Sequence, residues 1–386
     1  MIVIGAGAAG LMCALTAGAR GRRVVLLGHA DEAGKKILIS GGGRCNFTNL
    51  HSAPENFISG NPHFCKSALA RYTSHDFIAL IDKHRIPWHE KTLGQLFCDG
   101  SARAVVAMLL AECTAAGVEL RLGHRITDIS RADRFRVTTD QGDFTAPAMV
   151  LATGGLSIPK MGATGFAHDT ARRFDLKLTD MAPGLVPLTF ADDDLEMMRS
   201  LSGAALACIA SYGRVSFREA MLFTHRGLSG PAILQISSFW RAGGDITLNL
   251  LPDLDAGPYL IDAKDARPRA APRTVLSDIL PSRLAAALAE THLPARAMGD
   301  IPNRLLSALG GRLNRWRLTP SGSEGYAKAE VTRGGIDTSG LSSRTMEARN
   351  VPGLYAIGEA VDVTGWLGGY NFQWAWSSGV AAGEAV

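Results

Sequence analysis

The start of the chain constrains its fold more than any other segment. Ile2–Ile4 is a short apolar strand that runs directly into Gly5-Ala-Gly-Ala-Ala-Gly10. This G-x-G-x-x-G spacing is typical of the strand–turn–helix in which a dinucleotide pyrophosphate lies at a helix N-terminus. The alternative is a tight turn that binds nothing. We predict that the turn binds a nucleotide cofactor through Gly5, Gly7, Ala8, Ala9 and Gly10.

Two later segments end in a similar way. Ala148–Leu151 is an apolar strand followed by Ala152, Thr153, Gly154 and Gly155, and a second apolar strand near the C-terminus runs into Gly358 and Glu359. The Glu359 carboxylate is placed to accept hydrogen bonds from ribose or ribityl hydroxyls, or alternatively to cap the final helix. Nucleotide signals at both ends predict an α/β fold with a Rossmann-like domain built from both termini. This arrangement is more typical of a flavoprotein than of an NAD dehydrogenase.

The middle of the chain has a different composition, which predicts inserted domains. We expect a cofactor domain of residues 1–185 plus 326–386, a β-rich insert of 186–261 plus 314–325, and a helical subdomain of 262–313. Periodicity further predicts helices over 66–85 and 101–116, and we expect a last helix over 374–382. The short apolar runs 118–120, 125–129, 135–139 and 143–145 are expected to form a small antiparallel layer, and 215–218 and 219–224 two separate strands of the insert.

Composition limits the partners and the compartment. The chain has 386 residues, a net charge of +4 and six cysteines without a C-x-x-C motif. This argues against a zinc knuckle or a disulfide reductase, and we predict no metal. The mild positive charge permits an anionic partner such as RNA but does not require one. A strand that begins at Ile2 leaves no room for a signal peptide, and we find no membrane-spanning apolar run, so we expect a cytoplasmic protein without a membrane partner.

Residues 35–49 carry the most reactive chemistry. Three consecutive glycines, Gly41 to Gly43, suit a backbone that passes tightly over a ring or a phosphate, although a flexible surface loop is the alternative. Cys45 beside Arg44 predicts a thiol of lowered pKa that protonates a substrate carbon, or otherwise a buried structural thiol. In the insert, His225 and Arg226 are candidates for a general acid and a substrate-binding cation, or for an ordinary turn.

The chain resembles the HI0933-like flavoproteins, also called the YhiN or BaiN family, over nearly its whole length. The resemblance rests on the first glycine turn, on Lys35-Lys-Ile-Leu-Ile-Ser-Gly-Gly-Gly-Arg-Cys-Asn-Phe-Thr-Asn49, on Phe223-Thr-His-Arg-Gly-Leu-Ser-Gly-Pro231 and on Gly368-Gly-Tyr-Asn371. The sequence departs from the family at Gly28, where an acidic residue is usual, and at Cys98. The resemblance implies non-covalent FAD bound, beyond the residues above, by Lys36, Ser40, Gly41, Gly42, Gly43, Arg44, Asn46, Asp362, Gly369, Tyr370 and Asn371.

We therefore predict an FAD-dependent oxidoreductase whose flavin takes hydride from NAD(P)H or from a substrate. If NAD(P)H is the donor, it binds transiently, since no second glycine fingerprint predicts a nicotinamide domain. The acceptor, a small molecule or RNA, is expected at the flavin face between residues 41–46 and 224–230. One alternative is reduction of an RNA pyrimidine, an activity associated with part of the family that the chain resembles. Another is a non-catalytic FAD-binding sensor or assembly protein. The sequence does not indicate an oligomeric state.

Overall fold

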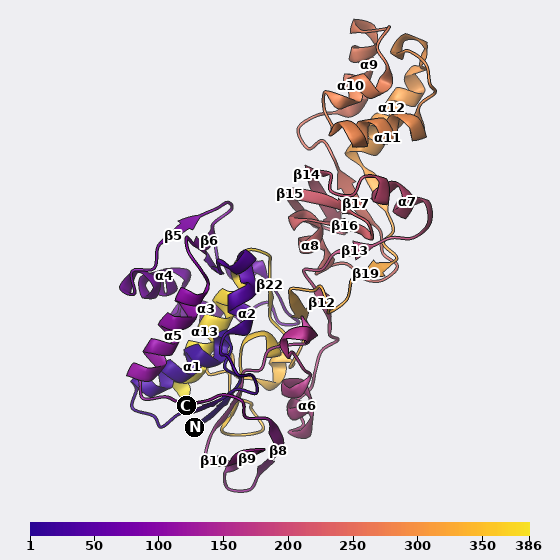
Figure 1. The fold of residues 1–386 in the computed structure, drawn as a ribbon. Coiled ribbons are helices and arrows are strands. Elements are labelled where there is room, and N and C mark those ends of the chain that lie inside the picture. The colour runs from indigo at the N-terminus through magenta and orange to yellow at the C-terminus, as the bar shows by residue number, and fades with distance from the viewer. The chain divides into compact units, whose positions relative to one another are not determined.

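The computed structural model describes residues 1–386, the side chain of Asp193 excepted. The chain forms two compact units (Figure 1). Met1–Ala182 and Val331–Val386 make up the first unit, and Pro183–Glu330 make up the second. The first unit is therefore assembled from two separate stretches of sequence.

A five-stranded parallel sheet forms the centre of the first unit. Its strands, in spatial order, are β21 (Leu354–Ala356), β11 (Met149–Leu151), β1 (Ile2–Ile4), β2 (Val25–Leu27) and β7 (Glu119–Arg121). β1 lies between β11 and β2, and β21 pairs with β11 in parallel, with Met149 opposite Leu354. Because β21 belongs to the last part of the chain, the sheet needs both termini. The predicted α/β fold, a Rossmann-like domain built from both ends, is confirmed.

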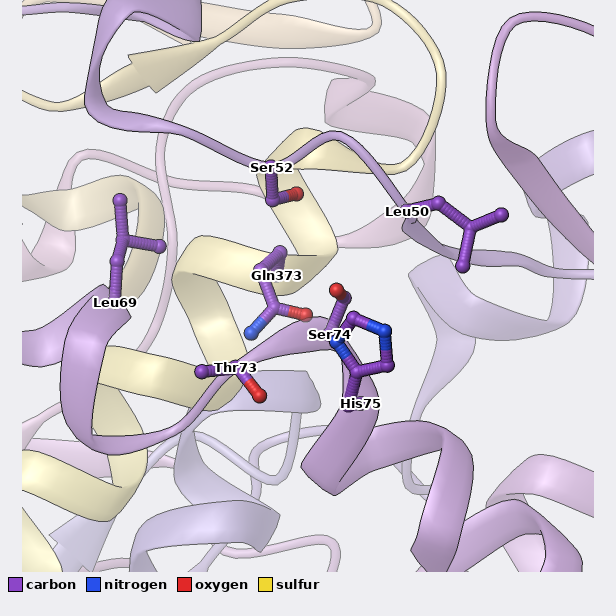
Figure 2. Close-up of a pocket in the computed structure, with 7 residues that line it drawn as sticks. All are labelled: Leu50, Ser52, Leu69, Thr73, Ser74, His75 and Gln373. Atoms are coloured by element: carbon purple, nitrogen blue, oxygen red, sulfur yellow. The ribbon is translucent and has the colours of Figure 1, made fainter.

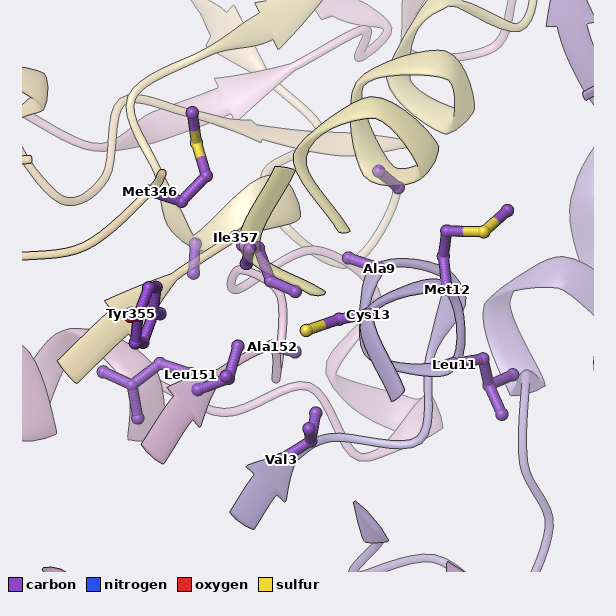
Figure 3. Packing of buried hydrophobic residues seen from close by; sticks show 14 of the residues in the cluster. Val3, Ala9, Leu11, Met12, Cys13, Leu151, Ala152, Met346, Tyr355 and Ile357 are labelled. Atoms are coloured by element: carbon purple, nitrogen blue, oxygen red, sulfur yellow. The ribbon is translucent and has the colours of Figure 1, made fainter. Parts of the chain in front are cut away.

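Helix α1 (Ala8–Ala19) packs against α13 (Tyr370–Ala385) and α5 (Arg103–Ala115). Small residues allow the close approach of α1 and α13, since a Cβ on Gly379 would lie 2.7 Å from the Ala9 carbonyl oxygen. Figure 3 shows Ala9 and Cys13 on the side of α1 that is nearer Ala152 and Ile357, which follow β11 and β21. The first and last helices thus share one core.

Three smaller sheets complete the strand pairing within the first unit. They are β10–β9–β8 (Gly142–Ala146, Phe135–Thr139, Ile126–Arg131), β3–β6–β5 (Asn46–Asn49, Gln95–Cys98, Trp88–Glu90) and the pair β22–β4 (Thr364–Gly365, Phe57–Ile58). The remaining helices of this unit are α2 (Lys35–Ile39), α3 (Lys66–Arg71), α4 (Ser74–Lys83) and α6 (Phe166–Arg173). Two short strands, β12 (Ala182–Gly184) and β20 (Val331–Arg333), lie where the chain passes between the units.

The second unit contains a seven-stranded sheet whose internal pairings are antiparallel. Its strands, in spatial order, are β18 (Trp316–Leu318), β17 (Ile246–Asn249), β14 (Ala205–Tyr212), β15 (Val215–Thr224), β16 (Gly227–Ser229), β13 (Leu188–Thr189) and β19 (Gly322–Ser323). Helix α8 (Pro231–Ser237) packs on β14 and β15. The other helices are α7 (Asp192–Ser200), α9 (Ala256–Ala266), α10 (Pro272–Ser277), α11 (Ser282–His292) and α12 (Asn303–Asn314).

Several predicted elements differ from the structure. The run 118–120 was expected in the antiparallel layer, but β7 pairs in parallel with β2, because helix α5 carries the chain across the central sheet. The predicted helix 66–85 is two helices, since α3 ends at Arg71 with Tyr72 as its C-cap and Thr73 is the N-cap of α4. The last helix begins at Tyr370 rather than residue 374, and residues 215–224 form one strand because no turn residue divides them.

No helix of the described residues has the length and apolar character that a membrane crossing requires. Nor, among those residues, do three His, Cys, Asp or Glu side chains form a group that could hold a metal ion.

Candidate functional site

The three glycines of the first turn have three different surroundings. A Cβ on Gly10 would overlap the Gly5 carbonyl oxygen, and a Cβ on Gly5 would overlap the carbonyl oxygen of Ala152. A Cβ on Gly7, in contrast, would meet nothing within 4 Å. Gly7 is also the N-cap of α1, whose first turn has no side-chain cap and no acidic residue. The turn therefore presents backbone amides and open space to an anion.

The turn after β11 lies directly against the first one. The Ala152 amide donates to the Ile4 carbonyl oxygen (2.8 Å), so β1 and β11 end side by side. Next to Ala152, the Thr153 hydroxyl is buried without a hydrogen-bond partner, and Gly154 has φ +75° with open space around its Cα. A buried hydroxyl without a partner is costly, and a polar ligand would satisfy it. The residues thus fit the phosphates of a dinucleotide.

The glycine loop 41–43 has left-handed backbone throughout, with φ of +56°, +68° and +84°. Cys45 also has positive φ (+53°), which costs a side-chain-bearing residue about 1–2 kcal/mol. Its amide donates to the Ser40 carbonyl oxygen (3.1 Å), which closes the loop, while the Arg44 side chain is exposed. Backbone strain of this kind is concentrated at functional sites.

The Cys45 thiol is fully buried, and burial raises the pKa of Cys45 far above its ordinary value. A hydrogen bond with Ser40 opposes this effect only in part. The predicted lowering of the Cys45 pKa is therefore wrong, because Arg44 points to solvent while the sulfur lies in the core. The thiol keeps its proton at neutral pH, and its role in catalysis stays a prediction.

Glu359 joins four segments of the first unit. Its carboxylate accepts hydrogen bonds from the Ser157 hydroxyl (2.8 Å), the Thr332 amide (2.8 Å) and the Lys36 ammonium (2.6 Å). Burial by itself favours the neutral acid, but Lys36, Thr332 and Ser157 together lower the pKa of Glu359. Glu359 does not cap the final helix, whose N-cap is Gly369. Lys36 and Glu359, both predicted site residues, form an ion pair, whereas Ser157 and Thr332 were not predicted from the sequence.

The start of α13 is packed against the strand that follows the glycine loop. Gly369 has φ +97°, and a Cβ there would overlap the Thr48 carbonyl oxygen and lie 2.9 Å from Asn46 Oδ1. Asn371 accepts from the Gly365 amide and donates to the Gly365 carbonyl oxygen (both 2.8 Å), so its side chain holds the preceding loop. Tyr370 is buried in the first turn of α13.

Asp362, another predicted site residue, accepts a hydrogen bond from the Gly60 amide (2.9 Å), and burial raises the pKa of Asp362.

Gln373 connects the same two elements and was not selected from the sequence. The Thr48 hydroxyl donates to Gln373 Oε1 (2.6 Å), and Gln373 Nε2 donates to the Tyr72 carbonyl oxygen (2.9 Å). Figure 2 shows Gln373 at a small cavity. The cavity is lined by Leu50, Ser52, Leu69, Thr73, Ser74, His75 and Gln373, and none of the predicted site residues belongs to it.

The remaining predicted residues lie in other places. His225 and Arg226 belong to the second unit, where they form the exposed turn between β15 and β16, and Arg226 lies 3.7 Å from Glu324. Their catalytic roles stay predictions. At the end of β2, a Cβ on Gly28 would lie 2.9 Å from Leu122 Cδ2. The Leu122 side chain thus leaves too little space for the Cβ of an acidic residue at position 28.

Comparison with known proteins identifies the family of this chain. The sequence model of a family described as the HI0933-like protein Rossmann domain matches residues 1–385. The chain belongs to the HI0933-like family. Among its relatives, the "Ribosomal RNA dihydrouridine synthase" of Escherichia coli K12 is 50% identical over 388 residues, which span 99% of this chain and 96% of that protein. The protein of the same name from Haemophilus influenzae is 42% identical, over 100% of this chain and 98% of that protein.

A solved structure outside the close relatives of this HI0933-like chain shares its fold. The 3-ketosteroid-delta4-(5alpha)-dehydrogenase of Rhodococcus jostii RHA1 superimposes with a TM-score of 0.50 at 14% identity, covering 99% of this chain and 96% of that one. At this identity the likeness shows the fold alone. The HI0933-like chain thus has a Rossmann-like FAD-binding fold with an additional antiparallel domain.

Proposed function

We propose that this protein is an FAD-dependent reductase of a uridine in ribosomal RNA. The observation that carries the proposal is its 50% identity, along nearly the whole of both chains, to a relative named ribosomal RNA dihydrouridine synthase. Of the two kinds of acceptor that the sequence left open, a small molecule or RNA, this relative favours RNA. A cytoplasmic location is part of it, because ribosomal RNA is the acceptor.

The residues of the first unit fit the cofactor. The amides at the N-cap of α1 and the open space at Gly7 would hold the pyrophosphate, and the free Thr153 hydroxyl would gain a partner. The uncapped first turn of α13 would stabilise negative charge on the flavin ring. When bound, FAD supplies the hydride for reduction. We propose NAD(P)H as the transient source of that hydride, since the chain has a single glycine fingerprint of this kind.

Reduction of the 5,6 double bond of uracil adds one hydride and one proton, so the chain must also provide a proton. The buried Cys45 thiol stays protonated at neutral pH and lies beside the strained glycine loop. We propose Cys45 Sγ as this donor. The role requires that substrate binding opens the loop to the sulfur, which is fully buried here, and that it brings the raised pKa of Cys45 closer to neutrality. His225 is the second candidate, because it is the exposed histidine of the Thr224–Gly227 turn.

The test is the dihydrouridine content of ribosomal RNA. A strain that lacks the gene for this protein is compared with the same strain complemented by the wild-type protein or by Gly7→Val. Nucleosides from purified ribosomal RNA are quantified by mass spectrometry. We expect dihydrouridine to disappear on deletion, to return with the wild-type protein, and to stay absent with Gly7→Val, because that variant cannot hold the pyrophosphate.

Two results would contradict the proposal. Unchanged dihydrouridine in the deletion strain, together with rapid NAD(P)H oxidation by the purified yellow protein, would favour a small-molecule acceptor. Unchanged dihydrouridine without any NAD(P)H oxidation would favour the non-catalytic sensor. Restoration of dihydrouridine by Gly7→Val at the wild-type level would contradict the cofactor placement.

A further inference from the structure

Large hydrophobic side chains are seldom exposed in the described part of the chain. Two are, Ile39 and Leu93, and Leu93 is the more exposed at 58% of its surface. Both belong to the first unit. Single exposed hydrophobic residues are common in proteins, so exposure alone does not indicate a binding role for Leu93. Its position in the fold is the further evidence.

Leu93 occupies the turn between strands β5 and β6, in a conformation that a leucine rarely adopts. Its φ is +51°, and the following Gly94 has φ +73°. Glycine or asparagine is the usual residue at the first position of such a turn, because a branched side chain is strained there. The chain therefore bears both an exposed apolar surface and backbone strain at one residue. An asparagine would remove both.

The turn is held firmly beside the start of helix α13. Asn49 Nδ2 donates to the carbonyl oxygens of Leu93 (3.0 Å) and Gly368 (2.9 Å). The Gly94 amide donates to Glu90 Oε1 (3.0 Å), and the Leu50 amide donates to the Gly94 carbonyl oxygen (2.9 Å). One side chain thus joins the Leu93 turn to the residue that precedes the N-cap of α13, the helix that we expect to face the flavin.

The other side of this hairpin contacts the glycine loop. A Cβ on Gly41 would lie 2.8 Å from Phe97 Cε1, and the ammonium of Lys91 lies 5.3 Å from the centroid of the same ring. Ile39 is two residues before Gly41. The hairpin and the glycine loop therefore pack against each other, and we call their exposed edge the rim. It carries the apolar Ile39 and Leu93 and the basic Lys91 and Arg44, all four exposed.

We propose that the turn 91–94 binds the RNA beside the target uridine, with Leu93 packed against a neighbouring base and Lys91 close to a phosphate. This inference rests on the proposed function. A uracil inside a stack is closed to a flavin, so the enzyme must hold it unstacked, and an apolar side chain at the rim can occupy the vacated stacking position. Sites for single-stranded RNA combine positive charge with side chains, usually aromatic, on which bases stack, and Leu93 would offer an aliphatic surface in place of an aromatic ring.

The test uses the FAD-loaded full-length protein, reduced chemically with dithionite so that the natural electron donor is not needed. Deproteinised ribosomal RNA from the deletion strain is added, and the rates of flavin reoxidation and dihydrouridine formation are measured without oxygen. Leu93→Asn relieves the strain and removes the apolar surface. Leu93→Met keeps an apolar side chain and is the matched control.

We expect Leu93→Asn to lower the second-order rate constant about 10-fold, near the lower end of the range for loss of one aromatic base-stacking contact, because leucine has no ring. Its Tm should be equal to or above that of the wild type, which a merely structural role for Leu93 would not produce. Leu93→Met should react within about twofold of the wild type, as surface substitutions usually do. Lys91→Ala should reduce the slope of log K for RNA binding against log salt by about 0.7, the value for one phosphate contact with a single strand.

The outcomes separate the two proposals. A wild-type protein that forms no dihydrouridine overturns the proposed function and the inference with it. An active wild type with an equally active Leu93→Asn variant overturns the inference alone. An unchanged salt slope in Lys91→Ala overturns the phosphate contact.

Discussion

At the scale of single residues, two glycines of the same turn should respond to substitution in opposite ways. Gly7→Val should leave the protein folded, because a Cβ at Gly7 meets no protein atom within 4 Å, but should abolish FAD binding by filling the space for the pyrophosphate. Gly10→Val should prevent folding, because its Cβ would overlap the Gly5 carbonyl oxygen. Bound flavin absorbance and a thermal melt distinguish these effects. A Gly7→Val protein with full FAD occupancy would refute the placement.

Cys45→Ala tests the proton donor. The variant should keep FAD, since a thiol is not needed to bind phosphate, and RNA reduction should fall by about 10²–10⁴-fold, the usual range for a lost general acid. Because burial raises the pKa of Cys45, the wild-type rate should show no loss from thiol ionisation between pH 6 and 9. Cys208→Ala is the control, since Cys208 is also a buried thiol but lies in the second unit. Equal rates for both variants would make Cys45 a structural thiol and leave His225 as the better candidate.

These two positions show what the sequence can predict at this scale. The spacing of Gly5, Gly7 and Gly10 predicts a turn whose geometry has few solutions, and the structure has that turn. The pKa of Cys45 depends on which way two adjacent side chains point. Neighbours in sequence lie on opposite sides of a folded loop, so adjacency to Arg44 carried no information about the sulfur.

At the scale of elements, the buried Asp362 should make stability depend on pH. It lies two residues before β22, and its amide donates to the Ile336 carbonyl oxygen. Burial raises the pKa of Asp362, so its contribution to stability is fully present below the ordinary aspartate value of about 3.9 and is lost as the pH rises through the raised value. Asp362→Asn keeps an acceptor for the Gly60 amide and cannot ionise. The Tm of the variant relative to the wild type should therefore increase from pH 4 to pH 7, in FAD-free protein.

The control for this prediction has the opposite sign. The hydrogen bond from Arg173 lowers the pKa of Asp128, which is exposed. Asp128→Asn should therefore lose a little stability relative to the wild type as the pH rises from the lowered value to the ordinary aspartate value of about 3.9, and should show no further change up to pH 7. The effect should weaken with added salt. Trends of the same sign in the two variants would show that at least one of the two carboxylates lacks the environment described.

Element boundaries were predicted where capping residues mark them and missed where tertiary contacts decide. The first strand, the first helix and the return of β21 follow from apolar runs that end in glycine. The pairing of β7 with β2 could not be predicted in this way. A strand of three residues has too short a pattern to show whether it belongs to the central sheet or to a neighbouring layer. The early start of α13 depends on the positive φ of Gly369, which is imposed by contact with Thr48.

At the scale of the whole molecule, the first unit should fold without the second. The chain leaves and re-enters the first unit on adjacent backbones, since the Thr179 amide donates to the Gly335 carbonyl oxygen (2.9 Å). Replacement of residues 183–330 by a short Gly-Ser linker should give a folded protein that binds FAD, because every predicted cofactor residue lies outside that stretch. Flavin content and a cooperative thermal melt check this. A colourless, aggregated product would show that the cofactor site needs the second unit. The finer division of that unit into a β-rich part and a helical subdomain stays a proposal.

The pairing of β21 with β11 has a consequence for the order of synthesis. The strands β1, β2, β7 and β11 leave the ribosome early, but the edge beside β11 and the helix against α1 come only with residues 354–385. The second unit is contiguous in sequence and is complete before then. Because domains generally fold as units during translation, the nascent chain forms the inserted unit while the cofactor domain is still unfinished. The protein can therefore capture its flavin only after residues 354–385 have been made.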